Sequence, residues 1–448
     1  MKCELQGSVT TNQISQEVSD MKYTQNFKIM QVTEKTLVIG VDVAKNKHYA
    51  RAFDWRGIEL CKVISFRTDQ RGFRRFREWA EKLAEDTGKN KIIVGMEPTG
   101  HYWFTFATDI DNHNMMVVQV NPYHVKQSKE MDDNTPSKND RKDCKTIAML
   151  VKDGRYLIPY FPKGKYAEIR KAYEIRETQL KAKSKLKNKV QRWFDIYFPE
   201  FTQVFKSWEG KTALMTLEKF PTPIKILELG AEKILAIWRK EVKRGVGIKR
   251  AEALVKAAEE SVGVQEGLEM AEYELQCILQ EYHAVRNMLE ITEQKLEEIA
   301  LQIPGTNKIL NIKGIGIITA AGFIAEVGDI SRFSHPKQII KLAGLNVREN
   351  SSGKHKGQTT ISKRGRRRLR SLLFRAILPL VAKNEVFKQL HEYNTTRPVN
   401  PLKKMQSLIA LCGKLIRIIY ALMTKDVEYS PEKLLSDIRR PEVMTQAA

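Results

Sequence analysis

Cysteine is scarce in this sequence, and the five cysteines are scattered singly along its 448 residues. No two of them form a C-x-x-C pair, which argues against a zinc site and indicates a reducing compartment. The first twenty residues are polar and lack the apolar core of about 7–15 residues that a secretory signal needs. No apolar run approaches the ~20 residues of a membrane-spanning helix. We therefore expect a cytoplasmic protein.

Acidic residues are also few relative to basic ones. The chain contains 53 Asp and Glu against 76 Lys and Arg, which gives a formal net charge of +23. An excess of this size indicates a polyanionic partner, because the summed positive field attracts such a partner. Nucleic acid is the first candidate, and an anionic membrane surface is the second.

In the N-terminal third of the chain, a polar stretch without pattern is followed by segments with strand and helix periodicity. Residues 1–34 show no periodic pattern, so we expect a flexible extension there. Residues 35–162 alternate between strand and helix patterns, and the mixture of a three-stranded meander with crossovers predicts a mixed α/β sheet. The strands are expected at 36–44, 48–55, 58–66, 91–97 and 115–120, and the helices at 71–88, at 101–112 and from 121 onward.

Strand patterns are absent from residues 163–302, where we expect a helical, coiled-coil region. The segment 166–194 is strongly basic, and a heptad seam with one polar break runs over roughly four heptads further on. Two interpretations of this seam stay open: a long helix packed inside its own chain, or a coiled-coil arm that also dimerises. The seam consists of Leu275, Ile278, Tyr282, Val285, Leu289, Thr292, Leu296 and Ile299.

Residues 303–425 are expected to form a mainly helical domain, followed by a tail at 426–448. Near its start, Gly314 and Gly316 lie in a turn that resembles a helix–hairpin–helix motif. Such a turn presents backbone N–H groups to a DNA phosphate. A plain glycine turn between packed helices is the alternative.

A basic run follows at 363–370 and continues into an apolar helix. Runs of this kind are usually solvated faces, but this one adjoins a serine-containing loop, so we expect it to contact phosphates. Ser362 is expected to cap a helix that begins at Lys363. The expected phosphate contacts are Lys363, Arg364, Arg366, Arg367 and Arg368.

The loop before this run reads ENSSGKHKGQTT (349–360) and has no apolar residue. We expect it to be flexible, and it is either a surface linker or the carrier of a nucleophile aimed at a phosphodiester. Serine needs activation to act in this way, and nearby cations would stabilise the phosphate charge. The adjacency of the two serines does not distinguish them. The residues concerned are Ser351, Ser352, Lys354, His355 and Lys356.

Four acids are expected to converge near one edge of the predicted sheet. Asp42 and Glu97 lie at the ends of two predicted strands, and Asp140 and Asp143 are three residues apart on a predicted helix. Carboxylates suit Mg²⁺, which takes oxygen ligands, and two such ions can stabilise the entering and leaving oxygens of a phosphoryl transfer. Singly, Asp140 would be a helix cap and Glu97 a turn residue. Together they predict a magnesium site.

The ordered set of motifs resembles a known family over residues 36 to 425. GVDVAKNKH, MEPTGHYWF, NPYHVKQ and NDRKD resemble the N-terminal domain of DEDD-type insertion-sequence transposases of family one-hundred-and-ten, the bridge-RNA-guided recombinases. IPGTNKILNIKGIGIITAAGFIAEVGD, RFSHPKQIIKLAGL, SSGKHKGQ and ISKRGRRRLRSLL resemble their C-terminal transposase domain. The central region is longer and richer in lysine than in compact members, and the N-terminal extension has no counterpart.

The resemblance implies a RuvC-like ribonuclease-H fold whose tetrad maps to Asp42, Glu97, Asp140 and Asp143, with two Mg²⁺ ions per site. It also implies a nucleophilic serine directly before a glycine, which is Ser352, and DNA cleavage through a covalent phosphoserine. The implied partners are donor and target DNA, an element-encoded guide RNA, and further copies of the chain in a tetramer built from dimers. The implied location is the nucleoid of a prokaryotic cell.

Three other functions are alternatives to this one. An actin-like or sugar-kinase ATPase would need a glycine-rich phosphate turn after the first strand, where this chain has VDVAKNKHYA. A catalytically silent nucleic-acid binder would not need acids at all four positions. A Holliday-junction resolvase would share the acids but use water, and so would not depend on Ser352.

Overall fold

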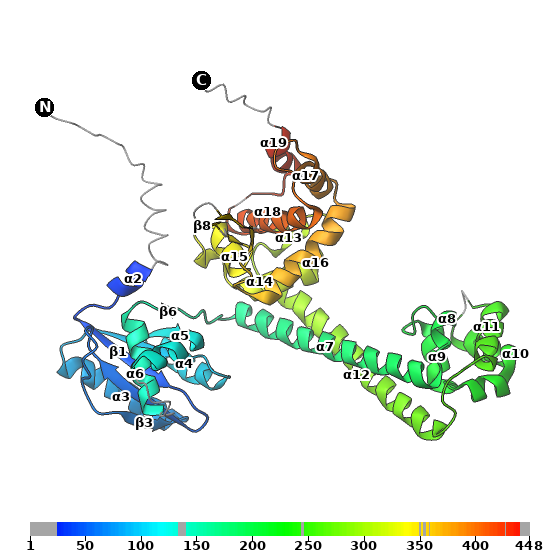
Figure 1. Ribbon diagram of the computed structural model, residues 1–448, viewed down its shortest axis with the longest axis horizontal. Coiled ribbons are helices and arrows are strands. Elements are labelled where there is room, and N and C mark those ends of the chain that lie inside the picture. The colour runs from blue at the N-terminus through cyan, green and yellow to red at the C-terminus, as the bar shows by residue number, and fades with distance from the viewer. Residues whose placement is uncertain are drawn as a thin grey trace. The chain divides into compact units, whose positions relative to one another are not determined.

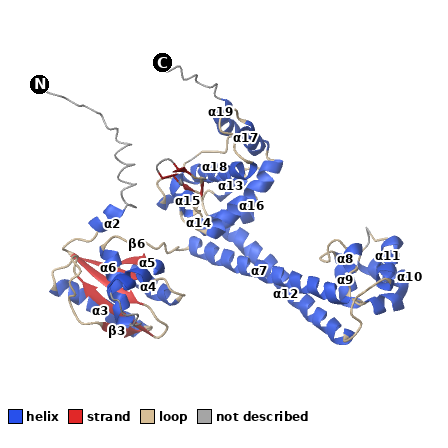
Figure 2. Ribbon diagram, in the orientation of Figure 1, coloured by secondary structure: helices blue, strands red, loops and turns tan. Residues whose placement is uncertain are grey.

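The computed structural model describes residues 25–132, 140–242, 246–348, 351–352, 355–357, 359–425 and 427–439. The chain forms two compact units, residues 1–161 and residues 162–448 (Figure 1). The first unit is a mixed α/β domain and the second is mostly helical (Figure 2). This confirms the mixed α/β N-terminal domain and the mainly helical remainder that the sequence predicts.

The first unit is built on one six-stranded sheet with strand order β3-β2-β1-β4-β5-β6. The first three strands form the predicted antiparallel meander, β4 and β5 run parallel to β1, and β6 is antiparallel to β5. The strands are β1 (Thr36–Asp42), β2 (Lys47–Phe53), β3 (Ile64–Arg67), β4 (Lys91–Met96), β5 (Met116–Val120) and β6 (Tyr156–Leu157).

Helices cover both faces of this sheet, because the buried side chains of a strand alternate between its faces. Leu37, Ile39 and Val41 pack with the helices α3 and α4, whereas Val38 packs with α5 and α6. The helices of this unit are α2 (Gln25–Met30), α3 (Gln70–Asp86), α4 (Tyr102–Asn112), α5 (Pro122–Asp132) and α6 (Asp140–Lys152).

The third strand is shorter than the predicted 58–66, and most of that segment is not a strand. The buried Asp54 carboxylate accepts hydrogen bonds from the backbone N–H groups of Arg56 and Ile58, at 2.9 and 2.8 Å. These bonds close a turn, and between it and β3 one isolated bridge pairs Phe53 with Glu59. The apolar alternation of the segment therefore does not lead to a continuous ladder.

The second unit contains a long helical hairpin made of α7 (Lys165–Tyr197) and α12 (Leu268–Leu301) (Figure 1). The helices are antiparallel: the indole N–H of Trp193 donates to the Ala271 carbonyl at one end, and Ile169 packs with Leu296 at the other. Among the described residues, four further helices connect α7 to α12, and they share one apolar core with the adjoining ends of these two helices. They are α8 (Phe201–Val204), α9 (Lys211–Lys219), α10 (Pro223–Glu241) and α11 (Ile248–Glu259).

The heptad seam of α12 packs against α7 of the same chain, and dimerisation of this arm stays a prediction. The polar break at Thr292 is matched by Gln179, whose side-chain amide donates to the Thr292 hydroxyl at 3.0 Å. Next to this pair, Arg176 Nε lies 2.7 Å from Glu293 Oε1. The break in the apolar seam is therefore a specific polar contact between the two helices.

The rest of the second unit is a helical domain with one apolar core. Its helices are α13 (Thr306–Leu310), α14 (Ile317–Val327), the 3₁₀ helix η1 (Ile330–Arg332), α15 (Pro336–Leu342), α16 (Arg367–Lys383), α17 (Glu385–Thr396), α18 (Lys404–Thr424) and α19 (Pro431–Arg439). Four two-residue strands lie between α15 and α16: β7 (Val347–Arg348), β8 (Ser351–Ser352), β9 (His355–Lys356) and β10 (Thr360–Ile361).

Within the described residues, α18 is the one helix that is long and apolar enough to cross a membrane, which the sequence reading did not anticipate. Lys414 and Arg417 interrupt its apolar run, which hides the length of the helix in the sequence. Its 18-residue apolar window is 44% buried, and Leu411, Leu415 and Ile419 lie in the core of the helical domain. We therefore assign α18 to that core.

Candidate active site

Asp42 and Glu97 lie side by side at one edge of the sheet. Asp42 is the last residue of β1, and Glu97 directly follows β4. The two strands are parallel neighbours, and Val41 is paired with Met96. The next residue on each strand is therefore an acid, Asp42 on β1 and Glu97 after β4. Adjacent strands lie about 4.8 Å apart. Both side chains are partly exposed, and Glu97 also accepts a 2.7 Å hydrogen bond from the Thr99 hydroxyl.

The helix α6 crosses the same strands at very short distance, because two glycines face it. An ideal Cβ at Gly40 of β1 would lie 1.9 Å from the Cys144 carbonyl oxygen and 2.8 Å from the Ala148 nitrogen. At Gly95, the partner of Gly40 on β4, it would lie 2.4 Å from Val151 Cγ2. The absence of both side chains lets the backbone of α6 rest on the sheet.

This packing brings Asp143 into the neighbourhood of Asp42. Cys144, the residue after Asp143, is buried against β1 and donates its thiol hydrogen to the Tyr49 carbonyl at 3.2 Å. Burial raises the pKa of this thiol to about 12, and the charges of Asp42 and Asp143 act in the same direction. Both carboxylates therefore lie close enough to one thiol to act on it through space. Cys144 itself is inert as a nucleophile, since almost none of it is thiolate near neutral pH.

The fourth expected acid, Asp140, is the first residue of α6, but its side chain lies outside the described part of the structure. Among the side chains that are described, no three acids, histidines or cysteines form a cluster that could hold a metal ion. Asp42, Glu97 and Asp143 offer oxygen ligands, which fit Mg²⁺. The carboxylates of Asp42 and Glu97, on adjacent strand ends, also repel one another unless a cation lies between them.

His48 is a residue of this site region that the sequence analysis did not assign. It lies on β2 and is fully buried, with its ring against Phe66 and Phe106 at centroid distances of 5.1 and 5.5 Å. Its Nδ1 accepts a 3.2 Å hydrogen bond from the backbone N–H of Ala44, two residues after Asp42. Burial lowers the pKa of His48 to about 4, so the ring is neutral and able to accept this bond. The histidine thus fixes the loop that leaves Asp42.

The two candidate nucleophilic serines lie in the second unit. Within the loop expected at 349–360, β8 and β9 form a short ladder in which Ser351 pairs with Lys356 and Ser352 with His355. A second ladder pairs β7 with β10. The residues at 353, 354 and 358, and the side chains of 351–356, lie outside the described part, so the expected roles of Lys354 and Lys356 are not addressed.

The expected cap at Ser362 is wrong. The helix α16 begins at Arg367, and its N-terminal boundary residue is Arg366 rather than a serine. Ser362 instead donates its backbone N–H to the Asn346 carbonyl at 2.7 Å. This bond continues the β7–β10 ladder, which takes the chain away from a helical path.

The basic run divides into two groups. Arg366 donates to the Glu326 carbonyl at the end of α14, and its Nη1 lies 3.7 Å from the Glu326 carboxylate. It therefore holds the fold together. Lys363, Arg364, Arg367 and Arg368 are exposed and available for phosphate contacts.

The glycine turn at 313–316 is an exposed helix start. Gly314 has a φ of 104°, which only glycine adopts easily. The Asn384 side chain donates to the Lys313 carbonyl at 2.8 Å and holds the turn from behind. Gly316 precedes α14, and a Cβ placed there would meet no atom within 4 Å. The first N–H groups of a helix have no partner within it, and at this helix they lie beside an exposed turn.

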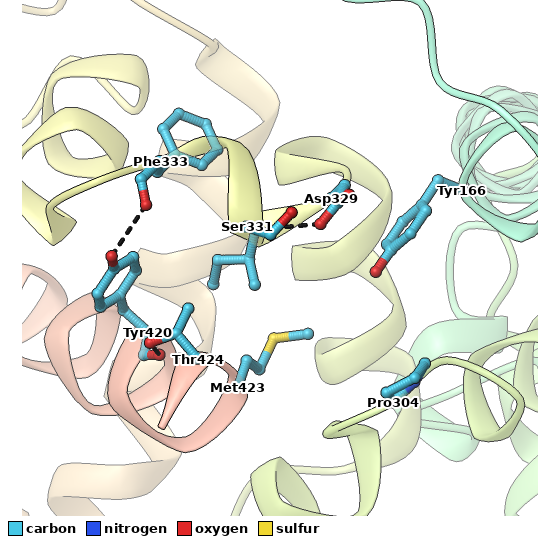
Figure 3. Close-up of a pocket in the computed structure, with 9 residues that line it drawn as sticks. Tyr166, Pro304, Asp329, Ser331, Phe333, Tyr420, Met423 and Thr424 are labelled. Atoms are coloured by element: carbon cyan, nitrogen blue, oxygen red, sulfur yellow. Dashed lines mark hydrogen bonds between the residues drawn. The ribbon is translucent and has the colours of Figure 1, made fainter. Parts of the chain in front are cut away.

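A pocket of about 370 Å³ lies elsewhere in the helical domain (Figure 3). Tyr166 and Asp329 line one side, and Tyr420, Met423 and Thr424 of α18 line the other. The Tyr420 hydroxyl donates to the Phe333 carbonyl at 2.9 Å, which stiffens the wall. Among the residues that the structure describes, none of the expected acids or basic residues borders this pocket.

Comparison with known proteins assigns the chain to a class. A family model described as the transposase family IS116/IS110/IS902 matches residues 306–392, and a DEDD transposase model of the IS110 type matches residues 39–199. The transposase for insertion sequence element IS1111A from Coxiella burnetii is 25% identical over 88% of this chain and 91% of its own length. An uncharacterised 44.8 kDa protein of insertion element IS116 from Streptomyces clavuligerus is 20% identical over 88% of this chain and 96% of its own.

These matches cover both units and define the class as transposases, which act on DNA. Within that class, the chain belongs to the IS110/IS116/IS902 family of insertion-sequence transposases. The family resemblance stated from the motifs is thereby confirmed.

Proposed function

We propose that this transposase cuts and rejoins DNA strands through a covalent phosphoserine at Ser352, in a reaction that depends on Mg²⁺ held by Asp42, Glu97, Asp140 and Asp143. The observation that carries the proposal is the register of β1 and β4, which aligns Asp42 with Glu97 beneath the helix of Asp143. This edge lies inside the segment that matches the DEDD model. We further propose that the first unit has a RuvC-like ribonuclease-H fold.

The acids have a defined task in this chemistry. Bound Mg²⁺ supplies positive charge to the attacking and leaving oxygens of an in-line displacement. The carboxylates would hold the ions, and the partly exposed strand ends would leave room for a DNA phosphate. His48 keeps the Asp42 loop in place without adding charge, because its ring is neutral.

Ser352 supplies the nucleophile. Its Oγ forms a bond to phosphorus, the bond from phosphorus to one sugar oxygen breaks, and the serine proton ends on that leaving oxygen. Rejoining is the reverse reaction with the sugar oxygen of another strand. A glycine follows Ser352 in the sequence and permits close approach of a DNA backbone. His355 pairs with Ser352 across the β8–β9 ladder and would stabilise the phosphate charge.

The nucleic-acid contacts are proposed for the exposed cations and for the glycine turn. Lys363, Arg364, Arg367 and Arg368 would bind phosphates, and Gly314 and Gly316 would offer backbone N–H groups. The element-encoded guide RNA and the tetramer rest on the family resemblance alone. A tetramer would supply the four nucleophiles that four strand cuts across two DNA molecules require.

The test looks for DNA attached to protein. The chain is expressed with the noncoding flanks of its own element, given labelled element-end and target DNA with Mg²⁺, and denatured. We expect an adduct with the wild type and with Ser351→Ala. Ser352→Ala and Asp42→Asn should lower it by on the order of a thousandfold or more, because each removes a member of one catalytic unit.

Other outcomes identify the competing functions. Cleavage without any adduct would make water the nucleophile and leave a resolvase-like nuclease. Neither cleavage nor adduct, with DNA binding retained, would favour a silent nucleic-acid binder. An adduct that disappears in Ser351→Ala and persists in Ser352→Ala would reassign the nucleophile.

A further inference from the structure

The helical hairpin of the second unit is divided by charge. The helix α7 carries ten Lys and Arg against four Asp and Glu, a net charge of +6. The helix α12 carries two Lys and Arg against eight Asp and Glu, a net charge of −6. Attraction between the two helices is the simplest reason for this division. If it were the whole reason, every cation of α7 would have an acidic partner within the unit.

Several cations of α7 are already paired within the unit. Arg176 binds Glu293 of α12 at 2.7 Å. Lys183 and Lys187 lie 3.2 and 2.5 Å from the two carboxylate oxygens of Glu209, which precedes α9. With about 100° per residue, these three cations occupy one side of α7. Their charges serve the contacts among the helices.

A different side of α7 carries cations that the hairpin does not use. Lys181, Lys185 and Arg192 are exposed, and among the described residues none of them forms an ion pair. Their spacings of four and seven residues place them within about 40° of the helix circumference and spread them over ~16 Å. No acidic residue occurs between 179 and 194. We call these three residues the cationic face of α7.

The exposed polar side chains between them fit the same use. Ser184 and Asn188 lie one turn from Lys181 and Lys185, and both are exposed. Hydroxyl and amide groups bind phosphate oxygens alongside Lys and Arg in nucleic-acid complexes. A membrane-binding helix would also need large exposed apolar side chains. On α7 the one such side chain among the described residues is Ile175, outside the cationic face.

We propose that the cationic face of α7 binds the phosphodiester backbone of a nucleic acid, so that the hairpin takes part in substrate binding as well as in joining the helical parts of the unit. The proposal extends the function given above but does not depend on the serine chemistry. Its three cations would neutralise three phosphates along the bound strand. The bound strand is DNA or RNA, since both offer the same phosphates.

The experiment measures binding as a function of salt. Full-length protein is titrated with a labelled DNA duplex and, separately, with a labelled RNA duplex of equal length. In Lys181→Gln/Lys185→Gln/Arg192→Gln, loss of three phosphate contacts should make the slope of log Kobs against log salt about 2–3 units less steep. Affinity near 0.1 M salt should fall on the order of tenfold to a hundredfold. The arm that shows the change identifies the nucleic acid.

A matched variant removes the same amount of charge elsewhere. Lys233, Lys240 and Lys249 are exposed residues of α10 and α11, and their triple replacement by Gln should leave the slope near the wild-type value. Equal slopes in both triple variants would overturn the proposal. The proposal would also be overturned if the cationic-face variant lost binding to anionic lipid vesicles while its nucleic-acid binding stayed unchanged. Ser352→Ala should keep the full slope, which separates failure here from failure of the catalytic proposal.

Discussion

At the scale of single residues, His48 holds the loop that follows Asp42, one of the proposed metal ligands, without taking part in the proposed chemistry. Its ring bridges two loops, with Nδ1 accepting from Ala44 and Nε2 lying 3.1 Å from the Thr68 hydroxyl. Protonation would add a hydrogen to Nδ1 and break the bond to Ala44. The buried ring among aromatic side chains disfavours the charged form. The loop after Asp42 is therefore stable only while the ring is neutral.

This neutral histidine makes the stability of the first unit depend on pH. Its pKa is about 4 in the folded chain and 6.5 when exposed, so between these values the unfolded chain binds the extra proton. Stability should thus fall as pH falls from 6.5 to 4, by about 3 kcal/mol in total from this group. Chemical denaturation of the full chain at several pH values measures the effect.

The control is His48→Gln, which removes the titrating group and keeps a polar side chain. We expect it to be less stable near neutral pH by roughly 1–2 kcal/mol, because the N–H of Ala44 loses a well-placed acceptor. Its pH dependence between 4 and 6.5 should be correspondingly flatter. A variant with the same slope as the wild type would mean that His48 is protonated in the folded chain.

Some of these residues were accessible from the sequence and others were not. Asp42 and Glu97 each follow a buried apolar run, so their places at strand ends could be predicted. The role of His48 depends on Thr68, twenty residues away, and on aromatic rings from other elements. Arg366 looked like its neighbours in the basic run, and only its contact with Glu326 distinguishes it.

At the scale of elements, the approach of α6 to the sheet sets the distance between Asp143 and Asp42. A methyl group at Gly40 would collide with the backbone of α6, which cannot move without shifting the whole helix. A methyl group at Gly95 would instead meet the side chain of Val151, which has other rotamers. Gly40 therefore makes room for the backbone of α6, whereas Gly95 makes room for one side chain.

We expect Gly40→Ala to destabilise the first unit by about 3 kcal/mol and Gly95→Ala by about 1–2 kcal/mol, as is typical of overpacking against rigid and adaptable neighbours. Denaturant unfolding of both variants measures the difference. Gly40→Ala should also reduce adduct formation beyond its effect on stability, since it displaces α6. Equal costs at the two positions would show that α6 shifts as easily as the Val151 side chain.

Apolar periodicity in the sequence predicts the bounds of strands and helices that bury one face, but it does not predict which element packs against them. The strands β1, β4 and β5 and the helix α3 agree closely with prediction because their apolar periodicity is strong. The heptad seam predicted a packed long helix but not its partner, because a seam fits any complementary helix. The contact between Gln179 and Thr292 identifies α7 as that partner.

At the scale of the whole molecule, the division into two units separates the acids from the serines in the sequence. Asp42, Glu97 and Asp143 belong to residues 1–161, and Ser351 and Ser352 belong to residues 162–448. The cores of the two units consist of different residues. The sequence predicted this change of texture from mixed to helical, since strand patterns end where the long helices begin.

Separate cores allow metal binding to be read from thermal unfolding of the intact chain. We expect two transitions, and Mg²⁺ should raise only the one that belongs to the first unit. At ten times the dissociation constant the gain is about 1.4 kcal/mol, by mass action on the folded state. Without metal, Asp42→Asn should raise the same transition, because it removes one of several carboxylates that repel one another.

With Mg²⁺ present, the first-unit transition of the wild type should lie above that of Asp42→Asn, the reverse of the order without metal. Asp42→Asn loses a ligand, so Mg²⁺ should shift its first transition far less than that of the wild type. Ser352→Ala provides the comparison, because it lies in the other unit and should respond to Mg²⁺ as the wild type does. Equal Mg²⁺ shifts in wild type and Asp42→Asn would remove Asp42 from the proposed site. A shift confined to the second transition would place the ion in the helical unit, where no acid of the proposed tetrad lies.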